Sequence, residues 1–300
     1  MTRLSRLAAT RYLTLYVLFA LVGGTALGQA RVANYQGLWW GAPAGSQAGW
    51  GINIAHQGDV IFATWFTYGP APFNAPRWYS MTATRTAEGI YSGTLVLTSG
   101  SSYAAVPYDP GALKVAPFTG SATLIFDSPT SGTLVYSPTS VEVRQPIVMQ
   151  AFGPLPTCVW GAMPDLAKAT NYTDLWWASP PGTEIGWGVN LTHQGTTIFA
   201  TWFTYDASGA AMWLSVTAPQ TGSATFSGTL YRTTGPSWGT VPFESDLVEY
   251  LAVGVATFAF TDGNAGTFVY SVNSQGGAGS SIRIKAITRQ IFRPPGTACQ

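Results

Sequence analysis

The chain contains two histidines, His56 and His193, and they occupy the same position of a repeated motif. Each ends a predicted strand beside a predicted hairpin turn. A histidine in this place could serve as a general base, but a base needs a partner that orients it, and no matched acid lies nearby in the sequence. The alternative is a structural histidine whose ring hydrogen-bonds the turn. The lack of a partner favours this alternative.

Motifs for the common catalytic sites are absent from the sequence. One histidine per repeat, with no cysteine or matched acid beside it, falls short of a set of metal ligands. There is no Gly-x-Ser-x-Gly motif, no phosphate-binding loop and no glycine-rich dinucleotide turn. A carboxylate pair for glycoside hydrolysis would need Asp109 and an unmatched acid such as Asp127 or Glu142, which is weak support. We therefore expect no catalytic residue, no metal and no cofactor, with a hydrolase that uses His56 and His193 as an alternative.

Tryptophan is the residue type that points most strongly to binding. The chain has 12 tryptophans, and ten of them occupy equivalent positions in two repeats. Neighbours along a strand point to opposite faces, so the adjacent Trp39 and Trp40 have different environments. The same holds for Trp176 and Trp177. One tryptophan of each pair could stack on a sugar or another planar ligand while the other belongs to the core. The alternative is that all of them fill the core.

Amide and hydroxyl groups accompany these tryptophans. Two asparagines each follow two glycines on the same strand face, which leaves space for a ligand or for a bulky neighbouring side chain. A threonine follows each of them on the next strand, and a long loop in each repeat carries an aromatic residue. The candidate ligand-binding residues are Trp39, Trp40, Asn53, His56, Thr64, Tyr103, Trp176, Trp177, Asn190, His193, Thr201 and Trp238.

A tandem repeat explains why the candidates come in pairs. GWGINIAHQG at 49–58 returns as GWGVNLTHQG at 186–195, and IFATWFTY at 61–68 returns unchanged at 198–205. The spacing between equivalent residues is 137 in these strings and falls to 135 and then 134 further along. Such a drift indicates small deletions in the loops between matched strands.

Two cysteines, Cys158 and Cys299, close equivalent ends of the repeats. An even number of cysteines in an exported chain predicts a disulfide, with two free buried thiols as the alternative. The expected domains are residues 31–158 and 171–300, and a short linker at 159–170 joins them. We expect each repeat to fold as a domain of its own.

The first 30 residues have the pattern of a secretory signal peptide. Three arginines precede an apolar run that is too short for a comfortable membrane span, and small residues follow it. Without residues 1–30, Lys and Arg fall from 14 to 11 against 13 acids, so the net charge changes from +1 to −2. So little charge gives no reason to expect a nucleic acid or an anionic membrane as partner. We expect a periplasmic or secreted protein without a membrane span after cleavage; an uncleaved anchor is the alternative.

Both repeats are predicted to be all-β. Their apolar runs are short, rich in β-branched and aromatic residues, and separated by turn-forming residues. Consecutive strands with short turns predict an up-and-down meander, and about eight strands per repeat can close into a small barrel. A β-sandwich is the main alternative, and a single membrane barrel is disfavoured because the strands are mostly too short. The strands expected in the first repeat are 37–41, 49–56, 60–68, 76–84, 91–98, 119–127, 131–138 and 141–152.

The string LWW…GWGxNxxHQG…FATWFTY, found at 38–68 and 175–205, resembles a repeat of exported proteins of unknown function in Gram-negative bacteria. The resemblance implies a bacterial exported protein and no particular activity. The expected number of strands is similar to that of the avidin and lipocalin barrels, and this similarity is one of architecture only.

Three functions fit these patterns. The leading hypothesis is an exported, non-enzymatic binding protein in which each domain holds a small or saccharide-like ligand through aromatic and amide side chains. The second is a protein-interaction, inhibitor or envelope structural module, with a partner that the sequence does not identify. The third is the hydrolase described above. A vacant, aromatic-lined barrel would favour the binding protein, and a filled barrel with a flat apolar patch would favour the interaction module.

Overall fold

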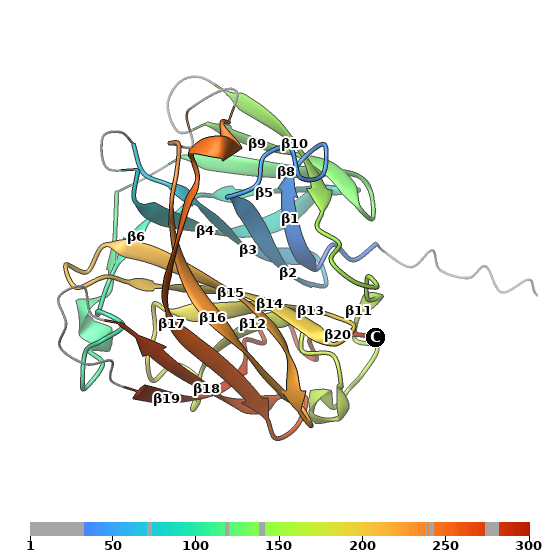
Figure 1. Cartoon of the computed structure of the whole chain (residues 1–300). Coiled ribbons are helices and arrows are strands. Elements are labelled where there is room, and N and C mark those ends of the chain that lie inside the picture. Colours follow the sequence, from blue (N-terminus) through green and yellow to red (C-terminus); the bar gives the residue numbers. More distant parts are fainter. Residues whose placement is uncertain are drawn as a thin grey trace, which may run out of the picture. The chain divides into compact units, whose positions relative to one another are not determined.

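The structure is a computed structural model, and it contains two closed antiparallel barrels of eight strands each (Figure 1). The all-β prediction of two barrels is therefore confirmed, and the β-sandwich alternative is wrong. The predicted signal peptide lies outside the described residues. The described residues are 33–70, 74–117, 120–137, 142–237, 239, 243–273 and 282–300.

The first barrel is a meander in which each strand pairs with the next along the chain, and its first and last strands close the ring. All eight strands expected from the sequence are present. They are β1 (Gly37–Gly41), β2 (Gly51–Gln57), β3 (Val60–Tyr68), β4 (Pro76–Ala87), β5 (Ile90–Thr94), β8 (Ser121–Ser128), β9 (Ser131–Ser137) and β10 (Val143–Met149).

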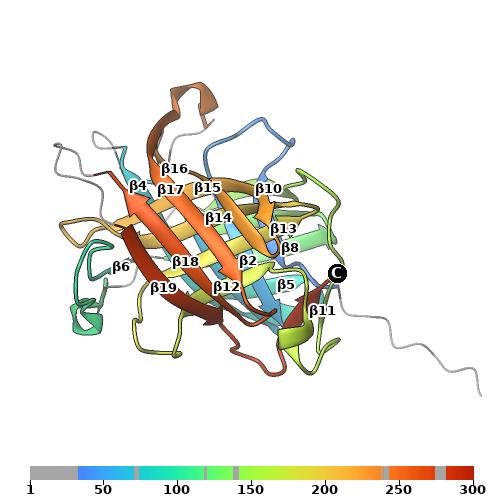
Figure 2. The same cartoon turned by 60° about the horizontal axis from the view of Figure 1, so that its bottom comes forward.

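The second barrel repeats this order and closes through the pairing of its first and last strands. Figure 2 brings the outer face of β17, β18 and β19 to the front. The strands are β12 (Asp174–Ala178), β13 (Gly188–Gln194), β14 (Thr197–Tyr205), β15 (Ala211–Gly222), β16 (Thr225–Thr234), β17 (Glu249–Phe260), β18 (Ala265–Val272) and β19 (Ile282–Arg289).

A small sheet of β11 (Cys158–Trp160) and β20 (Thr297–Cys299) joins the ends of the two repeats. Cys158 lies opposite Cys299 in this sheet, and the two form a disulfide. The prediction of a disulfide is confirmed. Residues 159–170, expected to be a plain linker, include part of β11 and the 3-10 helix η2 (Leu166–Lys168). The start of the linker is therefore held in the sheet with β20, and a short 3-10 helix follows it.

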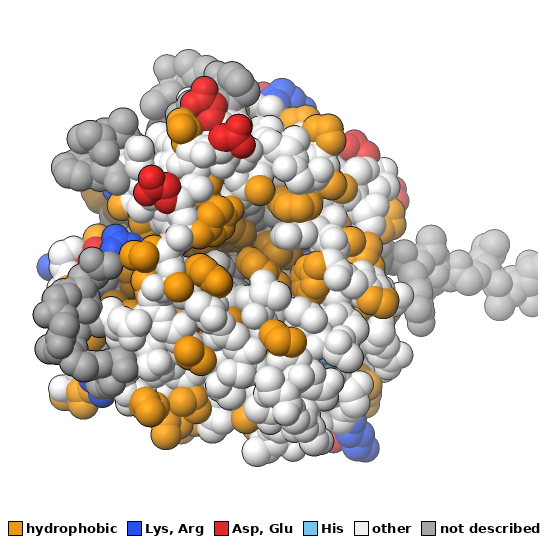
Figure 3. All heavy atoms as spheres, in the orientation of Figure 1, with side chains coloured by type: hydrophobic (Ala, Val, Ile, Leu, Met, Phe, Trp, Pro, Cys, Tyr) orange, Lys and Arg blue, Asp and Glu red, His pale blue; other side chains and the backbone are white. Residues whose placement is uncertain are grey.

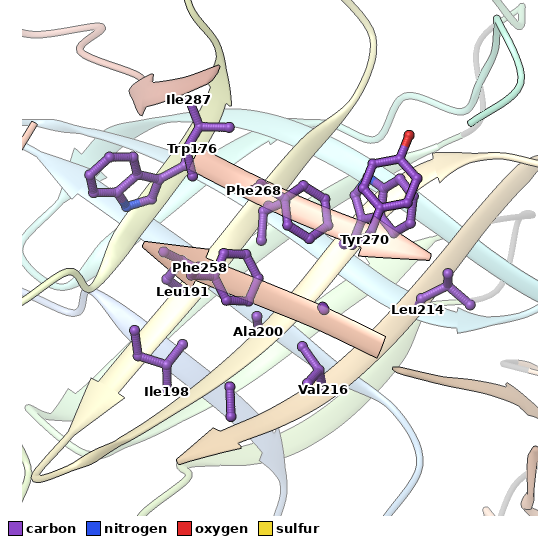
Figure 4. Packing of buried hydrophobic residues seen from close by; sticks show 14 of the residues in the cluster. Trp176, Leu191, Ile198, Ala200, Leu214, Val216, Phe258, Phe268, Tyr270 and Ile287 are labelled. Carbon is purple, nitrogen blue, oxygen red and sulfur yellow. The ribbon is translucent and has the colours of Figure 1, made fainter. Parts of the chain in front are cut away.

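Large apolar side chains fill both barrels. Alternation along each strand sends every second residue inward, so that Trp50, Ile52 and Ile54 all belong to the core of the first barrel. Figure 4 shows the equivalent packing in the second barrel, where Trp176 and Phe268 are fully buried. Among the described residues, these side chains pack against one another through the interior of each barrel.

The barrels also share a hydrophobic cluster where they meet. IFATWFTY does not alternate between apolar and polar residues, because one face of β3 or β14 fills its own barrel and the other face meets the neighbouring barrel. The contact has an approximate two-fold symmetry: the indole N–H of Trp78 donates to the carbonyl of Thr204 at 3.1 Å, and that of Trp213 donates to the carbonyl of Thr67 at 2.8 Å. The cluster comprises Leu38, Phe66, Tyr68, Trp78, Phe203, Tyr205, Trp213 and Val248.

The long loops of the two repeats are exchanged. The loop of the first repeat, with the hairpin β6 (Thr98–Ser99) and β7 (Lys114–Val115) and the 3-10 helix η1 (Pro110–Ala112), packs on the second barrel. There the carbonyl of Tyr103 accepts a 2.8 Å hydrogen bond from the hydroxyl of Tyr270. In return, Val248 of the second repeat packs on the first barrel, directly after the 3-10 helix η3 (Ser245–Leu247). The contact is so close that a Cβ atom on Gly49 would lie 2.6 Å from the side chain of Val248. Each barrel therefore packs against a loop of the other repeat, and folding of one repeat alone stays a prediction.

Candidate functional site

The two histidines are buried parts of the barrel ends. The imidazole Nδ1 of His56 accepts the backbone N–H of Tyr35 at 3.0 Å, and its Nε2 lies 3.0 Å from the carbonyl oxygen of Gly58. His193 repeats both contacts, with Tyr172 at 3.3 Å and Gly195 at 3.0 Å. An Nδ1 that accepts an amide N–H carries no proton, so the ring is the neutral Nε2–H form. Each ring therefore fastens its own turn to the start of the repeat.

Burial also makes these rings poor bases. Desolvation lowers the pKa of His56 to about 4, and it lowers the pKa of His193 as well. The hydroxyl of Tyr91 lies 3.1 Å from Nε2 of His56, whereas Phe226 packs at the equivalent place beside His193. Neither ring has a carboxylate partner among its hydrogen bonds. This geometry corresponds to the structural interpretation and gives no support to the hydrolase.

The residue after each histidine connects the two repeats. The side chain of Gln57 accepts the backbone N–H groups of Phe292 and Arg293 through Oε1, and it donates to the carbonyl of Gln290 through Nε2. Gln194 makes the corresponding contacts to the tail of the first repeat. The repeated His-Gln pair is therefore a structural element, in which the first residue holds its own barrel and the second holds the tail of the other.

The tryptophan pairs divide as their alternation requires. Trp39 and Trp176 are 0% exposed, and each indole N–H donates to a backbone carbonyl four residues earlier at 3.0 Å. Trp40 and Trp177 point outward and are half-buried. The Nε1 atoms of both outer tryptophans are buried and have no hydrogen-bond partner in the described part of the chain. Of the four candidates, only the outer two can reach a ligand.

The asparagines and threonines meet in the middle of the barrel contact. Asn190 Nδ2 donates to Thr64 Oγ1 across the two barrels at 2.8 Å. The equivalent Asn53 and Thr201 are also buried, but Asn53 Nδ2 and Thr201 Oγ1 have no partner within the described ranges. The space beside the glycines belongs to neighbours, since a Cβ on Gly51 would lie 2.6 Å from the ring of Phe66. These polar residues join barrel to barrel, and of the four only Thr64 borders a described cavity.

The aromatic residues of the long loops have different outcomes. Tyr103 lies against the core of the second barrel, with its ring centroid 5.9 Å from that of Trp202. Its loop covers a cavity of about 10 Å³, which is room for about one water molecule. Tyr103 thus closes the barrel of the other repeat. Trp238 lies outside the described residues.

The candidate site is a groove between the barrels, with a volume of about 230 Å³. Trp177 and Trp187 of the second repeat border it, and Phe62 and Trp78 of the first repeat face them. Its hydroxyl and amide groups come from Thr64, Ser80, Thr98, Tyr205 and Gln290, and no charged side chain is among its described lining residues. Independently of these residues, Figure 3 shows one face of the protein with a central hollow around which hydrophobic side chains gather. We call the cavity bordered by Trp177, Trp187 and Trp78 the inter-barrel groove.

Several residues of this groove could not be found by reading motifs. Thr98 and Leu113 come from the exchanged loop of the first repeat, and Gln290 comes from the tail of the second. Only the packing of one barrel on the other brings them beside Trp177. The sequence signals that did lead to groove residues were the adjacent tryptophan pair, which includes Trp177, and the threonine of the next strand, Thr64.

The described residues contain no group of three or more His, Cys, Asp or Glu side chains that could hold a metal ion. No helix in the described ranges has the length and apolar character needed to cross a membrane. Comparison with family models, with curated proteins and with solved structures found no match.

Proposed function

We propose that the protein is an exported binding protein that holds a neutral, saccharide-like ligand in the inter-barrel groove. The observation that carries the proposal is Trp177, a half-buried indole at the groove whose Nε1 has no hydrogen-bond partner in the described chain. A buried N–H without a partner costs about 1–3 kcal/mol, and a ligand hydroxyl would remove this cost if the indole turned its N–H toward the groove on binding. The part of the Trp177 side chain that borders the groove also suits the apolar face of a sugar ring.

The chemistry of the lining restricts the class of ligand. The absence of charged side chains gives no means of holding a phosphate, a carboxylate or a cation. Hydroxyl groups of Thr98 and Ser80 and the amide of Gln290 offer uncharged hydrogen bonds instead. The disulfide between Cys158 and Cys299 agrees with function in an oxidising compartment outside the cytoplasm. Together these features support a neutral ligand that combines an apolar face with hydroxyl groups.

The test is calorimetric titration of the mature protein with short neutral oligosaccharides built from glucose, xylose or N-acetylglucosamine. Trp177→Ala should weaken binding by about 2 kcal/mol, or about thirtyfold. Trp40→Ala is the matched control, because it removes the equivalent indole of the other repeat, which does not border the groove. Trp177→Phe keeps a stacking ring and loses the N–H, so it should give an intermediate affinity. Equal binding by wild type and Trp177→Ala, with both still folded, would rule out this groove as the site.

A second candidate function is supported by the outer face of β17, β18 and β19, which Figure 2 brings forward. Ser271 of β18 pairs with Ile282 on one side and with Val255 on the other, so these three residues form one row across the sheet. Ile284 pairs with Val269 in the next row. Ile282 and Ile284 are 68% and 69% exposed. Such a patch on a filled barrel is typical of a protein-interaction surface.

The first repeat lacks this apolar face. Trp39 pairs with Met149, and the equivalent Trp176 pairs with Arg289, so Met149 and Arg289 are equivalent residues of the last strands. Counting back by the same number of residues in each strand places Glu142 at the position of Ile282 and Arg144 at that of Ile284. The double variant Ile282→Glu, Ile284→Arg therefore copies the first repeat. Sedimentation velocity tests the case in which the partner is a second copy. Association of the wild type that this variant abolishes would support the interaction module, and a wild type that stays monomeric at high concentration would count against self-association.

A further inference from the structure

A second cavity lies where the two repeats meet, and it differs in character from the inter-barrel groove. Its volume is about 300 Å³. Three cationic side chains border it: Arg77 on β4, Lys114 on β7 and Arg232 on β16. The remaining walls are mostly apolar, and they include Leu97, Val115, Met212 and several alanines. We call this the axial cavity, defined by Arg77, Lys114 and Arg232.

The axial cavity lies on the approximate two-fold axis of the protein. Arg77 and Met212 are equivalent residues of the two repeats, and so are Leu97 and Arg232, since both pairs are 135 residues apart as elsewhere in this part of the repeat. The first repeat therefore supplies Arg77 and Leu97, and the second repeat supplies an apolar residue where the first has Arg77 and an arginine where the first has Leu97. The result is a cavity with one arginine from each repeat on its walls.

No carboxylate of the described residues forms a salt bridge with these three cations. The salt bridges of the described residues involve Arg144, Lys285, Arg289 and Arg293, and none involves a cation of the axial cavity. Arg232 Nε is buried and has no hydrogen-bond partner within the described ranges. Asp206 is the one acid at the cavity, and its Oδ1 already accepts three hydrogen bonds from its own turn.

Unpaired cations in a partly buried cavity favour the entry of an anion. Charge-assisted hydrogen bonds from arginine to a carboxylate, sulfonate or phosphate are stronger than neutral ones, and the desolvated Arg232 Nε gains a partner that the protein does not supply. The apolar walls would contact an apolar body attached to the acidic group. Binding of an anion in the axial cavity does not depend on a ligand in the inter-barrel groove.

We propose that the axial cavity binds a small organic anion, with its acidic group between Arg77 and Arg232 and its apolar body against Leu97 and Met212. The probe for the test is 8-anilino-1-naphthalenesulfonate, which joins a sulfonate to an aromatic body. Its uncharged analogue N-phenyl-1-naphthylamine is the matched ligand control. Both are titrated into the full mature chain, by calorimetry and by fluorescence.

The variants follow from the repeat. Arg77→Met and Arg232→Leu each install the residue that the other repeat carries at the equivalent position, so they suit the local packing. Arg85→Met is the control, because Arg85 is an exposed arginine further along β4 that does not border the cavity. We expect the double variant Arg77→Met, Arg232→Leu to weaken sulfonate binding roughly tenfold or more, and Arg85→Met to leave it unchanged.

Two further measurements keep the result decisive. Binding of the uncharged analogue should not change in the double variant. In the wild type, raising NaCl from about 0.05 M to about 0.5 M should weaken binding of the sulfonate and not of the analogue. This salt test holds even if the double variant unfolds. The proposal is overturned if the wild type fails to bind the sulfonate, if binding is insensitive to salt, or if a folded double variant binds as tightly as the wild type.

Discussion

Acid should destabilise this protein through His56. In the unfolded chain this histidine takes up a proton near its ordinary pKa of 6.5, whereas in the folded protein burial lowers its pKa to about 4. Between these values the unfolded state binds more protons than the folded state, so the free energy of unfolding falls as the pH falls. His56 therefore contributes its full share of stability above pH 6.5 and none below about pH 4.

The size of the effect follows from the two pKa values. Each pH unit between 6.5 and about 4 corresponds to about 1.4 kcal/mol, so His56 accounts for about 3 kcal/mol over this window. The cause is visible in the contacts: protonation of Nδ1 would place its hydrogen against the N–H of Tyr35, 3.0 Å away. Asp174 acts in the opposite direction, because burial raises its pKa to about 6 even though Arg289 lies 3.1 Å away. The contribution of Asp174 to the free energy of unfolding therefore increases as the pH falls below about 6.

The assay is urea unfolding of wild type and His56→Gln at pH values from 7 to 4. A glutamine can accept from Tyr35 and donate to Gly58 without titrating, so the difference between the two proteins isolates the histidine and cancels Asp174. The advantage of wild type over the variant should shrink by about 3 kcal/mol across this range. Because the chain has two histidines, their ring signals in an NMR titration can be followed directly.

A ring signal of His56 that titrates near pH 6.5 in the folded protein would refute this reasoning. So would a difference between wild type and His56→Gln that stays constant from pH 7 to pH 4. Either result would mean that the ring is open to water and available as a base, which would reopen the hydrolase hypothesis.

The other predictions concern the tryptophans, the repeat boundary and the disulfide. Trp176→Ala should cost about 3–5 kcal/mol of stability, and Trp177→Ala clearly less, as measured by urea unfolding; equal losses would place both in the core. Residues 33–158 expressed alone with Cys158→Ser should form a homodimer in light scattering, because the exposed barrel contact is nearly self-complementary; a stable monomer would contradict this. Reduction of the bond between Cys158 and Cys299, which are 141 residues apart, should lower the free energy of unfolding by roughly 4–5 kcal/mol, and an unchanged urea midpoint would contradict the loop-closure argument.

Local patterns were enough to predict the fold class. The short β-branched and aromatic runs with turn residues between them gave the strands of the first barrel, because strand formation depends on alternation and turn chemistry that lie within a few residues. The even cysteine count at equivalent repeat ends likewise led to the disulfide. Alternation also separated Trp39 from Trp40, although it could not say which one faces inward.

The role of the polar motif residues was harder to read. Asn53 and Asn190 each follow two glycines on the same strand face, a pattern that suits a ligand or a bulky neighbour equally well. The neighbour proved to be the ring of Phe66 beside Gly51 and the exchanged loop beside Gly49. Both are long-range contacts, and a single sequence without a structure contains no direct record of them.

What the sequence by itself determined is therefore the repeat and the strands, and it favoured the closure of each repeat and the pairing of Cys158 with Cys299, which the structure confirmed. The tertiary structure alone decided that the barrels are filled, that IFATWFTY joins them, and that each long loop crosses to the other repeat. It also moved the candidate site from the barrel interior to the surface between the barrels, beside Trp177. The physical reason is that an outward-facing apolar residue satisfies the same local pattern whether it meets a ligand, a partner or a second barrel, and only packing distinguishes the three.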